Sequence, residues 1–365
     1  MVFLSPKIVR RQPLFFSLHI NNFTVSNGTS RGLLSAMPSG AEILPSLQQN
    51  TIRYGFPILV ALGNFGNLAI ILIFTRKSLR QSSCAFYLLC AAVFSLLGVN
   101  WGLVTNMYTV YHPPDPFGIS LSLCRTRGYI LQISSVLYRT MIVLASADRC
   151  ALSSVNAKIR SFSKPKVAIK MIIITSLFWM IISIHLPIFQ TIISGRCSVF
   201  GVYGIFFSLY QIFIFGLLLP ALMITFGILI QKNLSAIRSR VQPLAGATNI
   251  RQPMLNKRDM NLLKVVLAEV TVGFLLSFSY PIQLLYSVLT DSIPNKSQDR
   301  IWIETFMTFT ARTVLFYLNY CVTFYLYVIV SKSFRQEAKV IVLKCFMRTG
   351  QEHVSTINGS ITAAH

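Results

Sequence analysis

Seven stretches of the sequence are apolar on every face and are free, or nearly free, of Asp, Glu, Lys and Arg. A helix needs about 20 apolar residues to cross the roughly 30 Å hydrocarbon core of a bilayer. Barrel strands are about 10 residues long and alternate in polarity, so the pattern favours helices. The predicted spans are Tyr54–Thr75, Phe86–Tyr108 within the uncharged stretch Gln81–Pro114, Tyr129–Ala147, Met171–Ser194, Ser198–Gln231, Val270–Thr290, and Thr313–Ser331, which can begin as early as Trp302.

The composition agrees with this pattern. Of the 365 residues, 53% are hydrophobic and 12% are charged, whereas a soluble domain carries about 25% charged residues. An ordinary soluble enzyme is therefore disfavoured, and the content of Leu, Ile, Val and Phe excludes disorder. We predict an all-α membrane protein with a bundle of seven transmembrane helices.

The net charge of +23 is distributed in short basic clusters between the apolar stretches. Nucleic-acid binding would instead require a basic patch on a polar domain, so no nucleic-acid partner is expected. Of the Lys and Arg residues, 16 follow the first, third and fifth spans and 5 lie in the opposite loops, which predicts an extracellular N-terminus and a cytosolic C-terminus. The predicted organisation is an extracellular tail over residues 1–53, a membrane domain over 54–330 and a cytoplasmic segment over 331–365.

Other segments fit this orientation. The sequons at Asn22, Asn27 and Asn295 fall on the predicted outside and are candidate glycosylation sites. After the last span, apolar positions recur at helical spacing with basic residues on the other faces, which predicts a short amphipathic eighth helix along the membrane surface. Cys345 is a palmitoylation candidate there, with a free thiol as the alternative.

Polar residues and prolines recur at particular places in the spans. They are Gly66-Asn67 in the first span, Cys124 and Asp148-Arg149-Cys150 at the ends of the third, Trp179 in the fourth, Pro220 in the fifth, Pro281 in the sixth, and Asn319 to Tyr327 in the seventh. Their order and spacing resemble the rhodopsin-like family of G-protein-coupled receptors over about residues 54–346. The chain is most similar to divergent invertebrate neuropeptide receptors.

The resemblance implies a disulfide between Cys124 and Cys197, which would hold the loop before the fifth span across the mouth of the bundle; two unpaired thiols are the alternative. It also implies a switch made of Asp148, Arg149, Tyr327, Pro281, Pro220, Asn67 and Asn319. In this switch Arg149 turns toward a G protein when the inner half of the sixth span swings outward at Pro281. Ordinary interfacial charges and helix–helix hydrogen bonds are the alternatives.

The ligand is expected to be a peptide. An amine is disfavoured because the third span has Leu131 and Gln132 where amine receptors carry an aspartate, and the seventh span has no lysine for retinal. Gln132, Arg312, Tyr280 and Gln283 are the candidate ligand contacts. Arg312 is placed to meet an anionic group such as a peptide carboxylate, unless it extends to the membrane surface.

Several positions depart from the family pattern. Ser95 stands where the second span usually has an acid, Thr323-Phe324 replace an Asn-Pro pair, and Asn261 replaces an acid that would hold Arg149. These changes make the family's sodium site doubtful. Arg139, inside the third span, is expected to bond carbonyls or a partner across the bundle. Glu269 is expected to meet Lys264 or lipid head groups.

The expected function is a plasma-membrane receptor that couples an extracellular ligand to a heterotrimeric G protein, with arrestin as a further partner. A signalling-impaired or atypical seven-helix receptor is the first alternative. A membrane transporter is less favoured because no broken helices or coupling-ion site stand out. The spans offer only His185 and Glu269 as candidate catalytic groups, so no enzyme, cofactor or metal site is expected.

Overall fold

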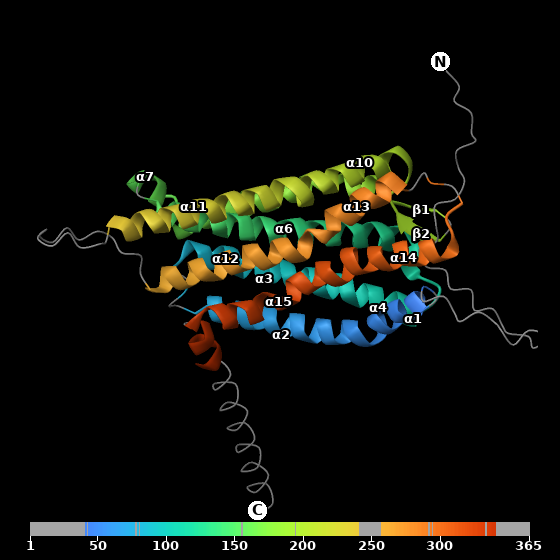
Figure 1. Cartoon of the computed structure of the whole chain (residues 1–365), viewed down its shortest axis with the longest axis horizontal. Helices are drawn as coiled ribbons and strands as arrows, with labels where there is room; N and C mark the ends of the chain where they lie inside the picture. The colour runs from blue at the N-terminus through green and yellow to red at the C-terminus, as the bar shows by residue number, and fades with distance from the viewer. Residues whose placement is uncertain are drawn as a thin grey trace, which may run out of the picture.

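The computed structural model describes residues 41, 43–76, 79, 81–154, 156–193, 195–240, 257–290, 293, 295–332 and 334–340. Within these residues, seven helices are long and apolar enough to cross a membrane. They run side by side as one elongated bundle (Figure 1). The predicted fold class, an all-α membrane protein with seven spanning helices, is confirmed.

The seven spans are interrupted in places by short π-helical segments. The first four comprise α1 (Ile43–Asn50), η2 (Thr51–Gly55) and α2 (Phe56–Phe74); α3 (Ser83–Val99), η3 (Asn100–Val104) and α4 (Thr105–Tyr111); α6 (Leu121–Ser153); and α8 (Pro165–Ile182) with α9 (His185–Phe189). The last three comprise α10 (Gly201–Gln211), η4 (Ile212–Leu218) and α11 (Leu219–Arg240); α12 (Lys257–Ser277) and α13 (Ser279–Thr290); and α14 (Gln298–Phe309), η5 (Thr310–Val314) and α15 (Leu315–Val330).

Short elements mark the two ends of the bundle. The hairpin of β1 (Thr191–Ile193) and β2 (Arg196–Ser198), together with α5 (Pro116–Ile119), lies at one end, which we call the hairpin end (Figure 1). The opposite end carries α7 (Ala157–Arg160), and we call it the Arg149 end. Local sequence explains where helices start: Asp115 accepts the N–H of Phe117 at the start of α5, and a proline opens α8.

Several helices are longer than the apolar stretches that predicted them. The first span begins at Ile43, inside the segment assigned to the tail, and the third runs from Leu121 to Ser153 rather than Tyr129 to Ala147. The polar residues at the ends of α6 explain this difference, because Arg125 and Asp148 find hydrogen-bond partners in the protein. A spanning helix therefore need not end where its apolar stretch ends.

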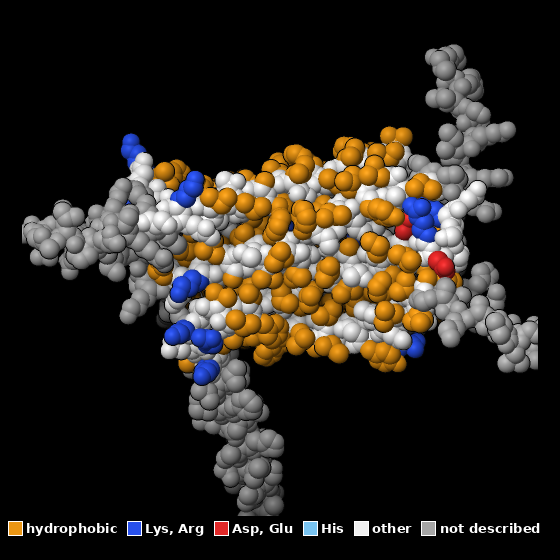
Figure 2. All heavy atoms as spheres, viewed as in Figure 1, with side chains coloured by type: hydrophobic (Ala, Val, Ile, Leu, Met, Phe, Trp, Pro, Cys, Tyr) orange, Lys and Arg blue, Asp and Glu red, His pale blue; other side chains and the backbone are white. Residues whose placement is uncertain are grey.

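The third span is the centre of the bundle. Of its most apolar stretch, 72% is buried, against 17% for the fourth span. The outward faces of the other helices are apolar, and Figure 2 shows hydrophobic side chains along the flank with Lys and Arg near the two ends. This distribution suits a hydrocarbon layer around the middle of the molecule.

Candidate functional site

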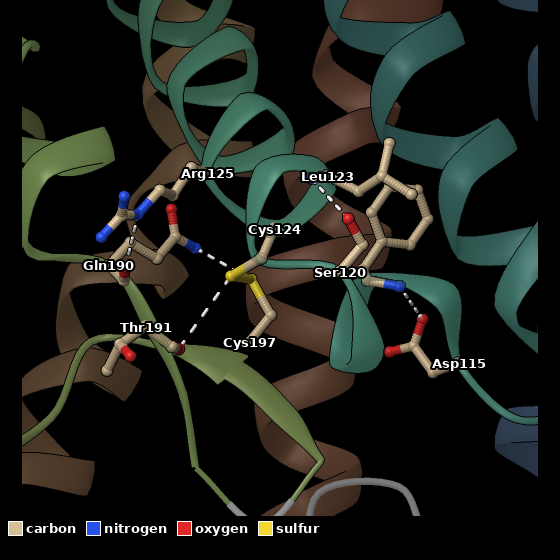
Figure 3. The surroundings of a disulfide bond; sticks show 9 residues. Asp115, Ser120, Leu123, Cys124, Arg125, Gln190, Thr191 and Cys197 are labelled. Atoms are coloured by element: carbon tan, nitrogen blue, oxygen red, sulfur yellow. Dashed lines mark hydrogen bonds between the residues drawn. A yellow bond between two sulfur atoms is a disulfide. The ribbon is translucent and has the colours of Figure 1, made fainter.

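The hairpin is attached to the central helix by the Cys124–Cys197 disulfide, as expected. Figure 3 shows Cys124 at the start of α6 and Cys197 on β2, with Gln190 and Thr191 beside them. Arg125 Nε donates to the carbonyl of Gln190 at 3.2 Å, and the Gln190 amide donates to the Cys197 sulfur at 3.2 Å. The hairpin is thus held to α6 by a covalent bond, and Gln190 is hydrogen-bonded to both α6 and the hairpin.

Beneath the hairpin lies a cavity of about 710 Å³, the hairpin-end cavity. Its walls come from every span except the first. All four predicted ligand contacts, Gln132, Tyr280, Gln283 and Arg312, line it. Residues separated by up to 180 positions in the sequence therefore share one site. The presence of any one of these polar side chains, taken alone, does not require a ligand.

An amide cluster crosses the floor of this cavity. The side-chain amides of Gln132 and Gln211 donate to each other at 3.3 and 3.1 Å, and Gln211 also donates to the Tyr280 hydroxyl at 3.3 Å. The cluster joins the third, fifth and sixth spans. Sequence reasoning missed Gln211 and the cavity-lining Arg127; both are polar side chains within apolar helices, which was the available indication.

At the Arg149 end, Asp148 and Arg149 form a buried ion pair. Arg149 is 2% exposed and Asp148 is 8% exposed. The Arg149 guanidinium donates to Asp148 Oδ2 at 2.6 and 3.1 Å, and Asp148 Oδ1 accepts from the hydroxyls of Ser83 at 2.5 Å and Ser163 at 2.9 Å. The pair is therefore part of the protein interior and not a pair of side chains that extend into solvent.

Arg139 lies in the middle of the bundle and bonds across it, as expected. Its guanidinium donates to Ser277 Oγ at 3.1 Å, and to the Ser135 carbonyl and the Tyr320 hydroxyl at 3.4 Å each. Its central carbon lies 4.5 Å from the ring centre of Phe316 and 4.9 Å from that of Phe215. Aromatic faces thus take up part of the role that an anion would have.

The expectation for Glu269 is wrong. The side chain is 3% exposed and points into the bundle, where its Oε1 accepts from the Tyr138 hydroxyl at 2.5 Å and the Thr323 hydroxyl at 3.0 Å. Lys264 is exposed and lies on another face of the helix. Because α12 begins at Lys257, Glu269 lies well inside the span. Thr323, one of the departures from the family pattern, therefore has a defined partner.

Glu269 and Arg139 also border one small cavity of about 20 Å³, which has room for about one water molecule. Among the described residues, the second oxygen of Glu269 has no hydrogen-bond partner. No sequence spacing connects Tyr138, Glu269 and Thr323, so this cluster could not be predicted.

The remaining switch candidates are buried polar groups near the seventh span. Asn67 donates to the carbonyls of Gly63 at 2.8 Å and Tyr320 at 3.1 Å, and Ser95 donates to the same Tyr320 carbonyl at 3.2 Å. Ser95 thus joins the second and seventh spans where the family would carry an acid. Asn319 lies 3.5 Å from Ser277 Oγ as a donor.

Tyr327 is 1% exposed and packs edge-on against Phe334, with ring centres 5.5 Å apart. Residues 334–340 are helical, so the structure describes the beginning of the predicted eighth helix. Phe334 also contacts the rings of Phe74 and Phe324. The start of this helix is therefore packed against the first and seventh spans.

The two prolines coincide with irregular helix. Pro220 lies in the first turn of α11, just after the end of η4 at Leu218, and Pro281 follows the break at Phe278 that separates α12 from α13. Proline lacks the N–H of a regular helical bond, so widening or interruption nearby is expected. A Cβ on Gly216 would lie 2.8 Å from Pro281 Cβ, so glycine permits the two spans to approach here.

Three modification candidates, Asn22, Asn27 and Cys345, lie outside the described residues. Asn295 is exposed in the segment between α13 and α14, at the hairpin end. Its accessibility is compatible with the predicted glycosylation.

The fold and these sites define a multi-pass membrane protein with a cavity at one end and a buried ion pair at the other. No protein-family model and no curated protein matches the chain.

Proposed function

We propose that the chain is a rhodopsin-like G-protein-coupled receptor of the plasma membrane, with the hairpin end outside and the Arg149 end in the cytosol. One observation carries the proposal: the same seven-helix bundle has a ligand-sized cavity covered by a disulfide-bound hairpin at one end and the buried Asp148–Arg149 pair at the other. The cavity volume lies in the range of about 300–1,000 Å³ of small-molecule sites.

In this proposal, a peptide ligand binds in the hairpin-end cavity and changes how the third, fifth and sixth spans meet at Gln132, Gln211 and Tyr280. The break at Phe278 lets α12 swing outward relative to α13. That movement releases Arg149 from Asp148 and opens a surface for the G protein. The ligand acts by favouring one of two arrangements of the bundle.

The test is Arg149→Ala in cells that display the chain, with a promiscuous Gα subunit as the readout of a ligand screen. We expect the substitution to abolish the response to an active ligand; because it also leaves Asp148 buried without its cation, the response is compared at matched amounts of receptor at the surface. An intact response in Arg149→Ala would contradict this mechanism. Tags on both termini of intact cells provide the topology control, since the two ends must lie in different compartments.

A signalling-impaired receptor is the second candidate, favoured by Ser95 and by Thr323-Phe324, which replace switch residues of the family. This candidate predicts that ligands bind and that no G protein responds. Binding of the screened compounds measured on purified protein, beside the cellular response, separates the two. Uptake of the bound compound into cells would instead indicate a transporter.

A further inference from the structure

The walls of the hairpin-end cavity carry an unbalanced set of charges. The charged residues that line it are three cations and one carboxylate, namely Arg127, Lys296, Arg312 and Glu304. Glu304 accepts hydrogen bonds from Lys296 Nζ at 2.5 Å and from Arg300 Nε at 2.8 Å. This carboxylate is already compensated, so it does not balance the two lining arginines.

Both arginines are held by neutral groups. Arg127 donates to Asn106 Oδ1 at 3.0 Å, and its guanidinium lies over the Phe117 ring at 4.7 Å. Arg312 lies over the Tyr280 ring at 5.7 Å. Neither has an ion-pair partner within 4.0 Å among the residues that the structure describes.

Asp115 interacts electrostatically with Arg127 without a direct ion pair. One of its oxygens accepts the N–H of Phe117 at the start of α5, at 3.0 Å. A guanidinium has five N–H donors, so most of the donors of Arg127 and Arg312 are not used by these contacts. The planar fork of arginine matches a carboxylate in a two-bond arrangement.

We propose that Arg127 and Arg312 make the hairpin-end cavity a binding site for a ligand that carries a carboxylate. This inference rests on the proposed receptor function, whose ligand it describes. The cavity holds a surplus of positive charge in a partly desolvated space, where an anion gains more from each cation than it would in water.

The neutral part of the wall indicates what accompanies the carboxylate. Gln283 is 6% exposed; its amide nitrogen donates to Thr308, whereas its Oε1 has no partner among the described residues. That oxygen is itself buried, so it can accept an N–H group of the ligand only when the Gln283 side chain turns toward the cavity. Leu131, Phe207 and Phe316 supply apolar surface. The combination suits the C-terminal end of a peptide or an acylated amino acid.

The experiment measures the charge preference of the cavity directly on purified protein. A cysteine is placed in the wall with Ser208→Cys, and its labelling rates with 2-sulfonatoethyl and 2-(trimethylammonium)ethyl methanethiosulfonate are compared. Ile119→Cys, exposed at the same end and outside the cavity, is the control, and the parent chain gives the background. We expect the anion-to-cation rate ratio to be roughly tenfold higher in the cavity. A ratio no higher than the control would overturn the inference.

The arginines are then replaced in the Ser208→Cys background. Arg127→Gln with Arg312→Gln should reduce the ratio to that of the control. Arg127→Lys with Arg312→Lys keeps both charges and should preserve most of it. An undiminished ratio in the glutamine pair would assign the preference to other groups and contradict the proposal. Elution as a single species shows that each variant is folded.

The ligand source is addressed by protection of the same cysteine with three probes: N-acetyl-leucyl-phenylalanine, its C-terminal amide, and hexanoate. Slower labelling with the peptide acid alone supports a peptide or acylated amino acid, and slowing by both acids supports a wider class of organic acids. Equal protection by acid and amide, or none, would overturn the carboxylate site.

The assay needs neither a G protein nor an orientation in a membrane. Loss of charge selectivity therefore contradicts the carboxylate site alone, whereas intact selectivity with no cellular signalling contradicts the receptor function alone.

Discussion

Asp148 and Glu269 are both buried carboxylates of the bundle, and their surroundings differ. Asp148 contacts the Arg149 guanidinium at 2.6 Å and accepts from two serine hydroxyls. Glu269 accepts from two hydroxyls on one oxygen, while Arg139, which borders the same small cavity, donates to Ser277 instead. One carboxylate is thus compensated by direct contact and the other is held by neutral donors.

The difference separates two roles of buried charge. A carboxylate paired with a cation cannot be neutralised without leaving the cation alone, and breaking such a pair costs about 3–5 kcal/mol. A carboxylate held by hydroxyls can be replaced by an amide that keeps an acceptor in the same place. The same chemical change should therefore have very different effects at the two sites.

The largest effect is expected for Asp148→Asn. It leaves Arg149 buried without its anion, so the free energy of unfolding should fall by about 3–5 kcal/mol. Titration of the purified protein with sodium dodecyl sulfate in mixed micelles measures this. Ser163→Ala is the matched control, because it removes one hydroxyl from Asp148 and no charge. Equal losses in both variants would mean that Arg149 is not held by the ion pair.

An intermediate effect is expected for Tyr138→Phe. The substitution removes one of the two hydroxyls bound to Glu269 and leaves the ring in place, so the loss should be about 2 kcal/mol, within the range for removing one partner of a buried hydrogen bond. The same titration applies. Tyr111→Phe removes a hydroxyl at an exposed site and should change little. A loss at Tyr138 no greater than at Tyr111 would show that the contact with Glu269 contributes nothing.

The smallest effect is expected for Glu269→Gln. It keeps an oxygen for Tyr138 and Thr323 and replaces a buried carboxyl group that no cation contacts among the described residues. The free energy of unfolding should equal that of the parent or exceed it by up to about 1 kcal/mol. A loss as large as that of Asp148→Asn would show that Glu269 is paired after all, and would remove the distinction between the sites.

Much of this arrangement follows from the sequence. The uncharged stretches placed all seven spans, and the four ligand candidates share one cavity. The Tyr138–Glu269–Thr323 cluster could not be predicted, because contacts between spans depend on how each helix is rotated about its axis. A helix that is apolar on every face has no stripe that indicates this rotation. The position of Arg127 in the cavity wall was missed for the same reason.

The ends of the helices could not be predicted from the apolar pattern either. Hydrophobicity marks the part of a span that lipid can surround, whereas the ends of α6 are stabilised by the hairpin and by Ser83 and Ser163. Those contacts join residues distant in the sequence.

The π-helical segments η2, η3, η4 and η5 occur in the first, second, fifth and seventh spans. Each wide turn holds an extra residue, so the side chains beyond it are turned by about 100° relative to an uninterrupted α-helix. Deleting a single residue from Ile212–Leu218 would regularise that helix and carry Gln211 to another face. Which side chains face the cavity therefore depends partly on the number of residues in each helix. An insertion or a deletion can change the cavity wall without any substitution.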